Sequence, residues 1–185
     1  MNKNKNKNKN TVGNKKSYWG YVAGVCAILY AAPHLWWGLG IDFAFPGKYT
    51  SASNNFWSVA IGFWGMGLVA VLAALFCLSF VRPWGKKIPS LLLVIPGWVS
   101  AAGLTFWGLG YFYLRFFLGI NRVTSTEAFI YYDTNVHSVI WGYVWYTIFL
   151  IWGLSLCFTV LNYQRNLKLN HMPKTYNNEK SAKML

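Results

Sequence analysis

Hydrophobic residues occur along this chain in long blocks rather than in the rhythm of an amphipathic helix. Four blocks are long enough to cross a bilayer, which takes about 20 apolar residues in a helix; they cover residues 18–41, 56–81, 88–113 and 138–161. Because every backbone amide in hydrocarbon needs a partner within its own segment, we expect these blocks to be helices. They lack the short alternating segments of a membrane β-barrel. The pattern therefore predicts an all-α membrane protein with four transmembrane helices.

Composition agrees with this class of protein. Of the 185 residues, 55% are hydrophobic and 11% are charged, whereas about a quarter of the residues in a soluble domain are charged. Residues 1–17 form a low-complexity basic tail that we expect to be disordered, and residues 162–185 form a second polar tail. The transmembrane domain is therefore expected to cover residues 18–161.

The formal net charge of +13 is distributed unevenly along the chain. Fourteen basic residues and one acidic residue lie before the first predicted helix, between the second and third, or after the fourth, and these segments share one side of the membrane. On the other side, three basic and three acidic residues cancel. The positive-inside rule then places both termini in the cytoplasm. The charge also suits contact with the lipid bilayer, and nucleic acid is not expected as a partner.

The chain also contains an internal repeat. The segment AAPHLWWGLG (31–40) matches AAGLTFWGLG (101–110) at six of ten positions, an offset of 70. Further along, SVAIGFWGMG (58–67) matches SVIWGYVWYT (138–147) less closely at an offset of 80. The pattern favours two duplicated helical hairpins in parallel repeat, related by an axis along the membrane normal. Shared use of Trp, Gly, Leu and Ala is the alternative explanation.

Three cysteines, Cys26, Cys77 and Cys157, lie far apart within the predicted spans. The chain has no C-x-x-C pair of the kind that membrane thiol oxidoreductases use. We therefore interpret the cysteines as small packing residues, and no cofactor is expected.

One histidine lies inside a predicted span. His34 is six or seven residues from the outer end of the first helix, a depth of about 10 Å at 1.5 Å per residue. An imidazole there is costly unless it faces water, a partner or the bundle interior, so His34 is a candidate functional residue. The adjacent Pro33 removes one helical hydrogen bond and is expected to leave a carbonyl near Leu29 free for another group.

Other candidates lie in the same outer layer, and three interpretations remain open. In the first, His34 bonds to a neighbouring helix and the outer charges belong to an aromatic interface belt. In the second, an aromatic vestibule binds or transports an amphiphile or a cation; the ligand-binding residues would be His34, Trp37, Asp42 and Arg115. In the third, an acid–base or zinc site forms from His34, His137 and Asp133. No catalytic sequence motif accompanies these three residues.

The stretch HLWWGLG, followed by Asp42 and by Pro46–Gly47, resembles a family of small bacterial four-helix membrane proteins, the domain of unknown function 3995 family. In that family a His-x-x-Trp-x-x-Gly pattern closes the first helix, and here the pattern falls on His34, Trp37 and Gly40. The resemblance implies an integral membrane protein of bacterial type without an established activity, and it supplies no mechanism.

These features favour a non-enzymatic role. We expect a plasma-membrane scaffold or partner-binding protein, in contact with other membrane proteins or with further copies of itself in a homo-oligomer. The alternative is a site for a small ligand, for transport, for a metal or for acid–base chemistry in the outer half of the bundle around His34.

Overall fold

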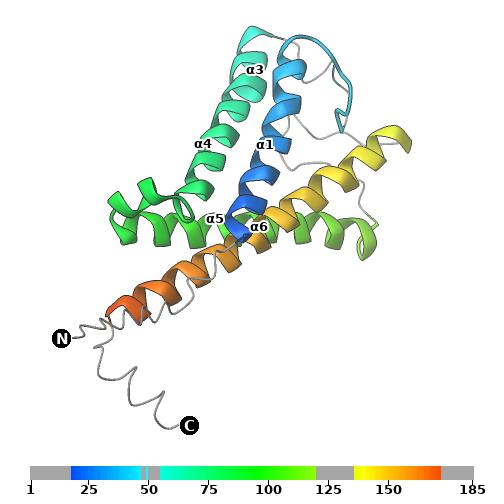
Figure 1. Ribbon diagram of the computed structural model, residues 1–185. Coiled ribbons are helices and arrows are strands. Elements are labelled where there is room, and N and C mark those ends of the chain that lie inside the picture. Colours follow the sequence, from blue (N-terminus) through cyan, green and yellow to red (C-terminus); the bar gives the residue numbers. More distant parts are fainter. Residues whose placement is uncertain (1–17, 47–48, 50–54, 120–135, 172–185) are drawn as a thin grey trace, which may run out of the picture.

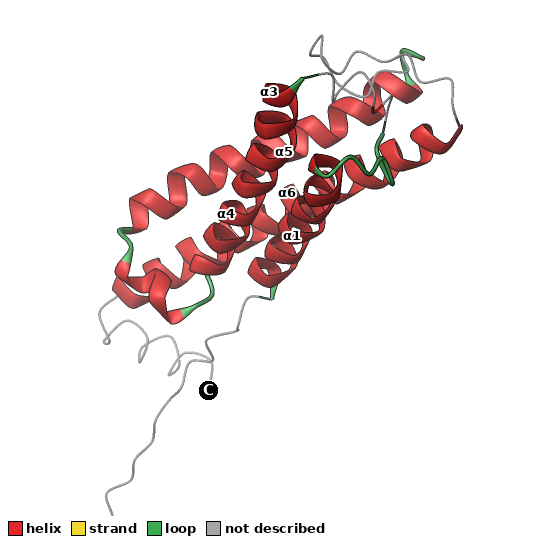
Figure 2. Cartoon of the chain, turned by 90° about the horizontal axis from the view of Figure 1, so that it is seen from above, coloured by secondary structure: helices red, strands yellow, loops and turns green. Residues whose placement is uncertain are grey.

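Every regular element that the structure describes is a helix (Figures 1 and 2). The computed structural model describes residues 18–46, 49, 55–119 and 136–171, without the side chains of residues 136–138, 170 and 171. No strand occurs within these ranges. The first predicted tail, and the second beyond residue 171, lie outside the described residues.

The first half of the chain forms two long helical stretches. One is α1 (Trp19–Gly38). The other is continuous over three elements, which are α3 (Phe56–Val59), the π-helical turn η1 (Ala60–Gly65) and α4 (Met66–Ser79). Both stretches coincide closely with the first two predicted spans, but α1 ends at Gly38 rather than near residue 41.

The second half of the chain forms two further long helices. A 3-10 turn, η2 (Pro83–Lys87), leads from α4 into α5 (Ser90–Phe116). The last helix is α6 (Val136–His171), which continues ten residues beyond the predicted end at residue 161. Those ten residues include Gln164, Arg165 and Lys168, residue types that favour a helix even outside the apolar core.

Three stretches are long and apolar enough to cross a membrane: Phe56–Ser79, Ser90–Phe116 and Val139–Leu169. This property indicates a membrane protein. The helix α1 is not one of the three, since its 20 residues include a proline, a histidine and several Gly, Tyr and Trp residues. The first predicted span, residues 18–41, and with it the total of four, therefore stays a prediction.

The helices α1 and α6 form the centre of the arrangement. α1 packs against α4 and against α6, and α6 also packs along α5. Figure 1 shows the α1–α4 pair standing across the α5–α6 pair. Only 28% of the most apolar part of Phe56–Ser79 and 22% of that of Ser90–Phe116 is buried, against 50% for the last helix. Most of the surface of α4 and α5 is thus available to lipid or to a partner.

Small side chains bring the helix backbones close together in the core. The main core cluster joins α1, α4 and α5 to larger side chains of α6 through the buried alanines Ala23, Ala27, Ala74 and Ala101. Hydroxyl groups near this core bond to their own helices: Thr105 Oγ1 donates to the carbonyl of Ala101, and Thr159 Oγ1 to that of Ser155, both at 2.7 Å. Such bonds satisfy a polar group without water, as a helix in lipid requires.

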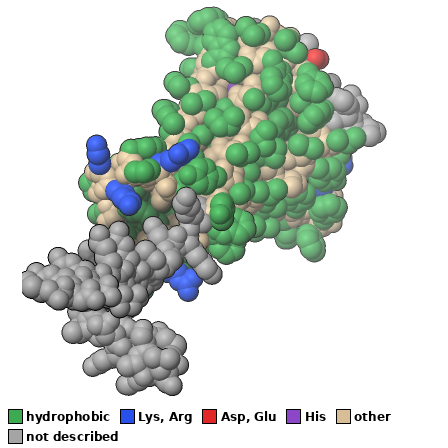
Figure 3. All heavy atoms as spheres, in the orientation of Figure 1, with side chains coloured by type: hydrophobic (Ala, Val, Ile, Leu, Met, Phe, Trp, Pro, Cys, Tyr) green, Lys and Arg blue, Asp and Glu red, His purple; other side chains and the backbone are tan. Residues whose placement is uncertain are grey.

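The outer faces of the helices are mainly apolar. On the face shown in Figure 3, hydrophobic side chains cover the helices, and basic side chains gather at the end where α4 meets α5. The turn at this end contains Arg82, Lys86 and Lys87, and the guanidinium carbon of Arg82 lies 5.4 Å from the ring centroid of Tyr21. An apolar band with a basic end is the surface expected for helices that lie in a bilayer.

Candidate functional site

The imidazole of His34 is buried and bonded to its own helix. Only 4% of the residue is exposed, and Nδ1 lies 2.8 Å from the carbonyl oxygen of Tyr30. Since a carbonyl oxygen can only accept, Nδ1 carries the proton of the neutral ring and Nε2 carries its lone pair. No hydrogen bond of Nε2 is found within the described part of the chain.

The first interpretation places the hydrogen bond of His34 on a neighbouring helix, but the bond that the structure shows lies within α1. Pro33 leaves the carbonyl of Leu29 without its helical donor, but the imidazole bonds to the carbonyl of Tyr30 instead. The reason is geometric, because a helical side chain leans back toward the residue four positions earlier. His34 is also shallower than predicted: α1 ends four residues later at Gly38, which places His34 about 6 Å from the helix end.

Aromatic rings and a glycine surround His34. The ring centroids of Tyr30 and Trp37 lie 4.6 and 4.9 Å from that of His34. On α4, Gly67 faces the histidine, and a Cβ atom at Gly67 would lie 3.1 Å from the Cβ of His34. The close approach of α1 and α4 at this point therefore depends on the missing side chain of Gly67. His34 fills a gap between two helices.

A glycine-based cap ends α1. Gly40 has a φ of +92°. Its amide donates to the carbonyl of Trp37 at 3.1 Å, and the amide of Ile41 donates to that of Trp36 at 3.0 Å. This is the Schellman arrangement, in which a left-handed residue follows the last turn and glycine is favoured. The cap gives a physical reason for a glycine three residues after Trp37.

Three indole groups hold the segment after α1, residues 39–46. We call this segment the outer loop, after the side of the membrane on which the charge pattern predicts it. Trp36 and Trp37 both donate from Nε1 to the carbonyl of Phe43, at 2.9 and 2.8 Å. Trp145 on α6 donates from Nε1 to the carbonyl of Ala44 at 2.9 Å. Ala44 is 2% exposed with a φ of 64°, a conformation that residues other than glycine adopt rarely. The indole bonds therefore fix a bent backbone and tie it to two helices.

An aromatic cluster fills the space beneath the outer loop. Its buried members are Trp37, Ala44, Phe45, Phe63 and Trp145. The ring of Trp37 meets those of Phe45 and Trp145 edge to face, with centroids 5.1 and 5.9 Å apart, and each such pair contributes about 1 kcal/mol beyond its buried area. The hydroxyl of Tyr49 donates to the carbonyl of Trp37. The cluster makes this end of the protein a packed cap.

The other predicted ligand-binding residues have hydrogen-bond partners of their own. Arg115, in the last turn of α5, donates from Nε to the hydroxyl of Tyr143 at 3.1 Å. Asp42 is exposed in the outer loop, and its backbone carbonyl accepts a hydrogen bond from the amide of Phe45. Within the described chain, neither Asp42 nor Arg115 bonds to His34. Of the ligand-binding set, His34 and Trp37 are in contact through their rings, and the set as a whole stays a prediction.

The third interpretation depends on residues that the structure does not describe. Asp133 and the side chain of His137 lie outside the described residues. Within the described ranges, no group of three or more His, Cys, Asp or Glu residues is placed to hold a metal ion. The acid–base or zinc site of His34, His137 and Asp133 therefore stays a prediction.

Sequence reasoning did not include Trp145, Phe63 or Ala44 among the site residues, although they build the cap. The spacing of Trp141 and Trp145 places both on one face of a helix. This spacing is the one sequence feature that could have indicated an aromatic contact surface on α6. No sequence pattern identifies the acceptor of Trp145, because that acceptor is a backbone carbonyl 101 residues away in the chain.

Comparison of the chain with models of known protein families, with curated proteins and with solved structures gives no match. The fold and the site define a helical membrane protein with an aromatic cap at one end. The family resemblance based on His34, Trp37 and Gly40 stays a prediction.

We expect Trp145→Phe to lower the free energy of unfolding by about 1–3 kcal/mol, because it leaves the buried carbonyl of Ala44 without a donor while keeping most of the ring. Trp36→Phe is the matched control, since the carbonyl of Phe43 keeps its bond from Trp37. Unfolding of the detergent-solubilised protein, followed by circular dichroism, measures both losses. Equal losses in the two variants would contradict a special role for the bond to Ala44.

Proposed function

We propose that this protein is a non-enzymatic, partner-binding protein of the plasma membrane, with four transmembrane helices and both termini in the cytoplasm. The observation that carries the proposal is the outer loop. Its backbone is fixed by indole bonds from α1 and α6, and yet it exposes large apolar side chains. The proposed partner is another membrane protein that presents an apolar segment at the outer surface of the bilayer.

The exposed side chains of the outer loop support this role. Leu39 is 73% exposed, Ile41 52% and Phe43 59%. Apolar side chains grouped on an exposed surface are typical of interaction sites. Because the loop backbone is already ordered, a partner would not have to supply the free energy of ordering it. His34 belongs to the support of this loop, since its ring packs against Trp37.

The packing of α1 favours a fourth span. Near its start, a Cβ at Gly20 would lie 3.3 Å from the carbonyl oxygen of Cys77, close to the end of α4. At its last residue, Gly38 lies against the indole of Trp64, within η1. The helix α1 thus lies alongside Phe56–Ser79 for most of its length. We therefore expect α1 to cross the same bilayer as its neighbour, packed against α4 and α6.

The packing also supports a duplicated hairpin. A Cβ at Gly67 would lie 3.7 Å from the carbonyl oxygen of Ala31, and one at Gly153 would lie 3.1 Å from that of Ala101. Ala31 and Ala101 are equivalent in the repeat of the first helices. Gly67 and Gly153 are 86 positions apart, so this equivalence differs from the offset of 80 in the sequence comparison. Each hairpin thus brings a glycine of its second helix against the equivalent alanine of its first, although the two glycines are not equivalent in the sequence repeat.

Four spans and three spans predict different positions for the termini. With four, a reporter enzyme that is active only outside the cytoplasm is expected to stay inactive when fused at either Met1 or Leu185, because an even number of spans returns the chain to its starting side. The same enzyme inserted after Gly47 should be active. Activity at one terminus but not at the other would indicate an odd number of spans.

Photo-crosslinking in intact cells tests the proposed partner contact. We expect a photoreactive phenylalanine at position 39 to give a discrete protein adduct. The same group at Phe106, a residue 74% exposed in the middle of α5, should react with lipid. The adduct at position 39 should weaken several-fold in the Trp145→Phe background, where the outer loop has lost one bond to its backbone. Docking at the outer loop would be contradicted if positions 39 and 106 gave the same amount of protein adduct. It would also be contradicted if Trp145→Phe left the adduct at position 39 unchanged.

The unpartnered Nε2 of His34 favours a second candidate function. Its lone pair, beside the rings of Tyr30 and Trp37, could accept a hydrogen bond from a small ligand. In that case His34→Leu would abolish the cellular function while leaving the crosslink at position 39 intact. Under the primary proposal, His34→Leu lowers stability, and any loss of function follows the loss of folded protein.

A further inference from the structure

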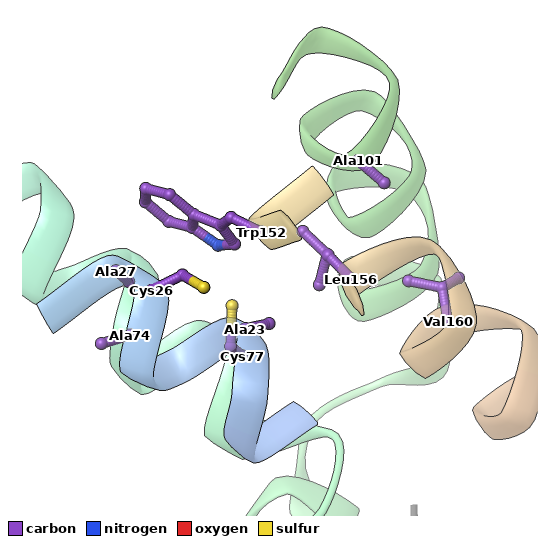
Figure 4. Close-up of a cluster of buried hydrophobic side chains, with 9 residues drawn as sticks. All are labelled: Ala23, Cys26, Ala27, Ala74, Cys77, Ala101, Trp152, Leu156 and Val160. Atoms are coloured by element: carbon purple, nitrogen blue, oxygen red, sulfur yellow. The ribbon is translucent and has the colours of Figure 1, made fainter. Parts of the chain in front are cut away.

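Two of the three cysteines meet in the core of the protein. Cys26 on α1 and Cys77 on α4 are 5% and 1% exposed, and both belong to the main core cluster. Figure 4 shows their sulfur atoms turned toward each other and toward the indole nitrogen of Trp152, which comes from α6. Both cysteines are free thiols. Three helices therefore direct two sulfur atoms and one N–H group at a common point.

The indole N–H group of Trp152 needs a hydrogen-bond acceptor at this point. Trp152 is 5% exposed, and its Nε1 is a buried donor without a hydrogen-bond partner. A buried N–H group without an acceptor destabilises the folded state, because it has lost its hydrogen bonds to water. A thiol sulfur is a weak acceptor, whereas a thiolate is a stronger one because hydrogen bonds to ionised groups are about twice as strong. A ligand that converts the thiols to thiolates would therefore give the N–H group of Trp152 a stronger acceptor.

The register of α1 and α4 separates the two sulfur atoms. A Cβ at Gly24 would lie 3.7 Å from the carbonyl oxygen of Ala74, so these residues are level. Cys26 and Cys77 are displaced from this level in opposite directions, by two and three residues respectively, which amounts to about 7.5 Å along the helix axes. The α-carbons are thus farther apart than a disulfide allows. Because each Cα–Cβ bond leans toward the start of its own helix, the two antiparallel helices direct the side chains toward each other. A single atom between the sulfurs fits this geometry better than a direct bond.

We propose that Cys26 and Cys77 bind one soft monovalent metal ion, Cu⁺ or Ag⁺, between α1 and α4. Thiolates favour Cu⁺, zinc and iron–sulfur clusters. Two thiolates in line suffice for Cu⁺ or Ag⁺, whereas an iron–sulfur cluster is usually held by four cysteines. Zinc takes four ligands in structural sites, and the described residues offer no group of three His, Cys, Asp or Glu ligands. Binding converts two thiols and M⁺ into a bis-thiolate complex of charge −1 and releases two protons, without any change of oxidation state. Trp152 then donates to a thiolate sulfur, as outer-shell groups commonly do at metal sites.

Competition with a chromogenic Cu⁺ chelator tests this site. The full chain is purified in detergent and kept reduced and anaerobic. We expect one Cu⁺ per wild-type chain, and none above the chelator background in Cys26→Ser or Cys77→Ser. Cys157→Ser is the matched control, because Cys157 lies on α6 outside the buried members of the cluster, and it should bind as the wild type does. Trp152→Phe should retain the site but bind about ten-fold more weakly, as loss of an outer-shell partner typically causes.

Two further measurements keep the test independent of variant folding. Circular dichroism and size exclusion establish whether each serine variant is folded. In the wild type itself, Cu⁺ should raise the unfolding temperature, since a ligand that binds the native state stabilises it. Three results would each overturn the proposal. The first is no rise of the unfolding temperature with Cu⁺, and the second is wild-type Cu⁺ binding by folded Cys26→Ser or Cys77→Ser. The third is rapid formation of a Cys26–Cys77 disulfide under mild oxidation. The site does not depend on the proposed function of the outer loop.

Discussion

Gly85→Ala is expected to cause the largest loss of stability of any single methyl addition in this protein, at least about 3 kcal/mol. Gly85 lies in η2, the turn between α4 and α5. A Cβ at this position would lie 1.7 Å from the carbonyl oxygen of Ser79 and 2.5 Å from its carbonyl carbon. Both atoms belong to the backbone, so no side-chain rotation relieves the overlap. The turn would have to open, and α4 and α5 would lose their short connection.

Lys86→Ala provides the control for this prediction. Lys86 is the next residue of the same turn and is exposed, so its truncation is expected to change stability by less than about 0.5 kcal/mol. Denaturant-induced unfolding in detergent micelles compares the two variants with the wild type. A Gly85→Ala protein as stable as Lys86→Ala would show that the turn does not pack as described.

Gly153→Ala is expected to separate α5 from α6, with a loss of about 2 kcal/mol. A Cβ at Gly153 would lie 2.4 Å from the hydroxyl oxygen of Thr105 and 2.7 Å from its backbone nitrogen. The hydroxyl is itself bonded to the carbonyl of Ala101, so the clash involves both a fixed side chain and the backbone of α5. The two helices can accept the methyl group only by moving apart, which weakens the packing of the second hairpin.

Gly103→Ala is the matched control on the facing helix. No atom lies within 4 Å of the position that its Cβ would occupy, and alanine has the higher helix propensity by about 1 kcal/mol. We therefore expect Gly103→Ala to be neutral or stabilising. Thermal unfolding of the two variants should give shifts of opposite sign or of clearly different size. Equal destabilisation would mean that glycine acts through helix flexibility rather than through the contact with Thr105.

The candidate site was predictable in part. His34 and Trp37 were recognised because ionisable and aromatic residues inside an apolar block are unusual, and the structure places their rings together. For Asp42 and Arg115 the structure describes hydrogen-bond partners other than His34, and a shared depth in the membrane does not set which helix faces which. The acceptor of His34 could be derived only from the direction of its side chain. The role of Trp145 could not be predicted, because its hydrogen bond goes to a backbone carbonyl of the outer loop and no local sequence pattern identifies such an acceptor.

The sequence by itself determined that the chain is helical and suited to a membrane. Long apolar blocks act through a bulk property, the transfer of side chains into hydrocarbon, which does not depend on which residues touch. The tertiary structure alone decided that α1 and α6 lie at the centre, that indoles of two helices converge on the outer loop, and that Cys26 meets Cys77. These features depend on helix register and rotation. Both are set by close contacts of small residues such as Gly67 and Gly153, whose partners lie far away in the chain.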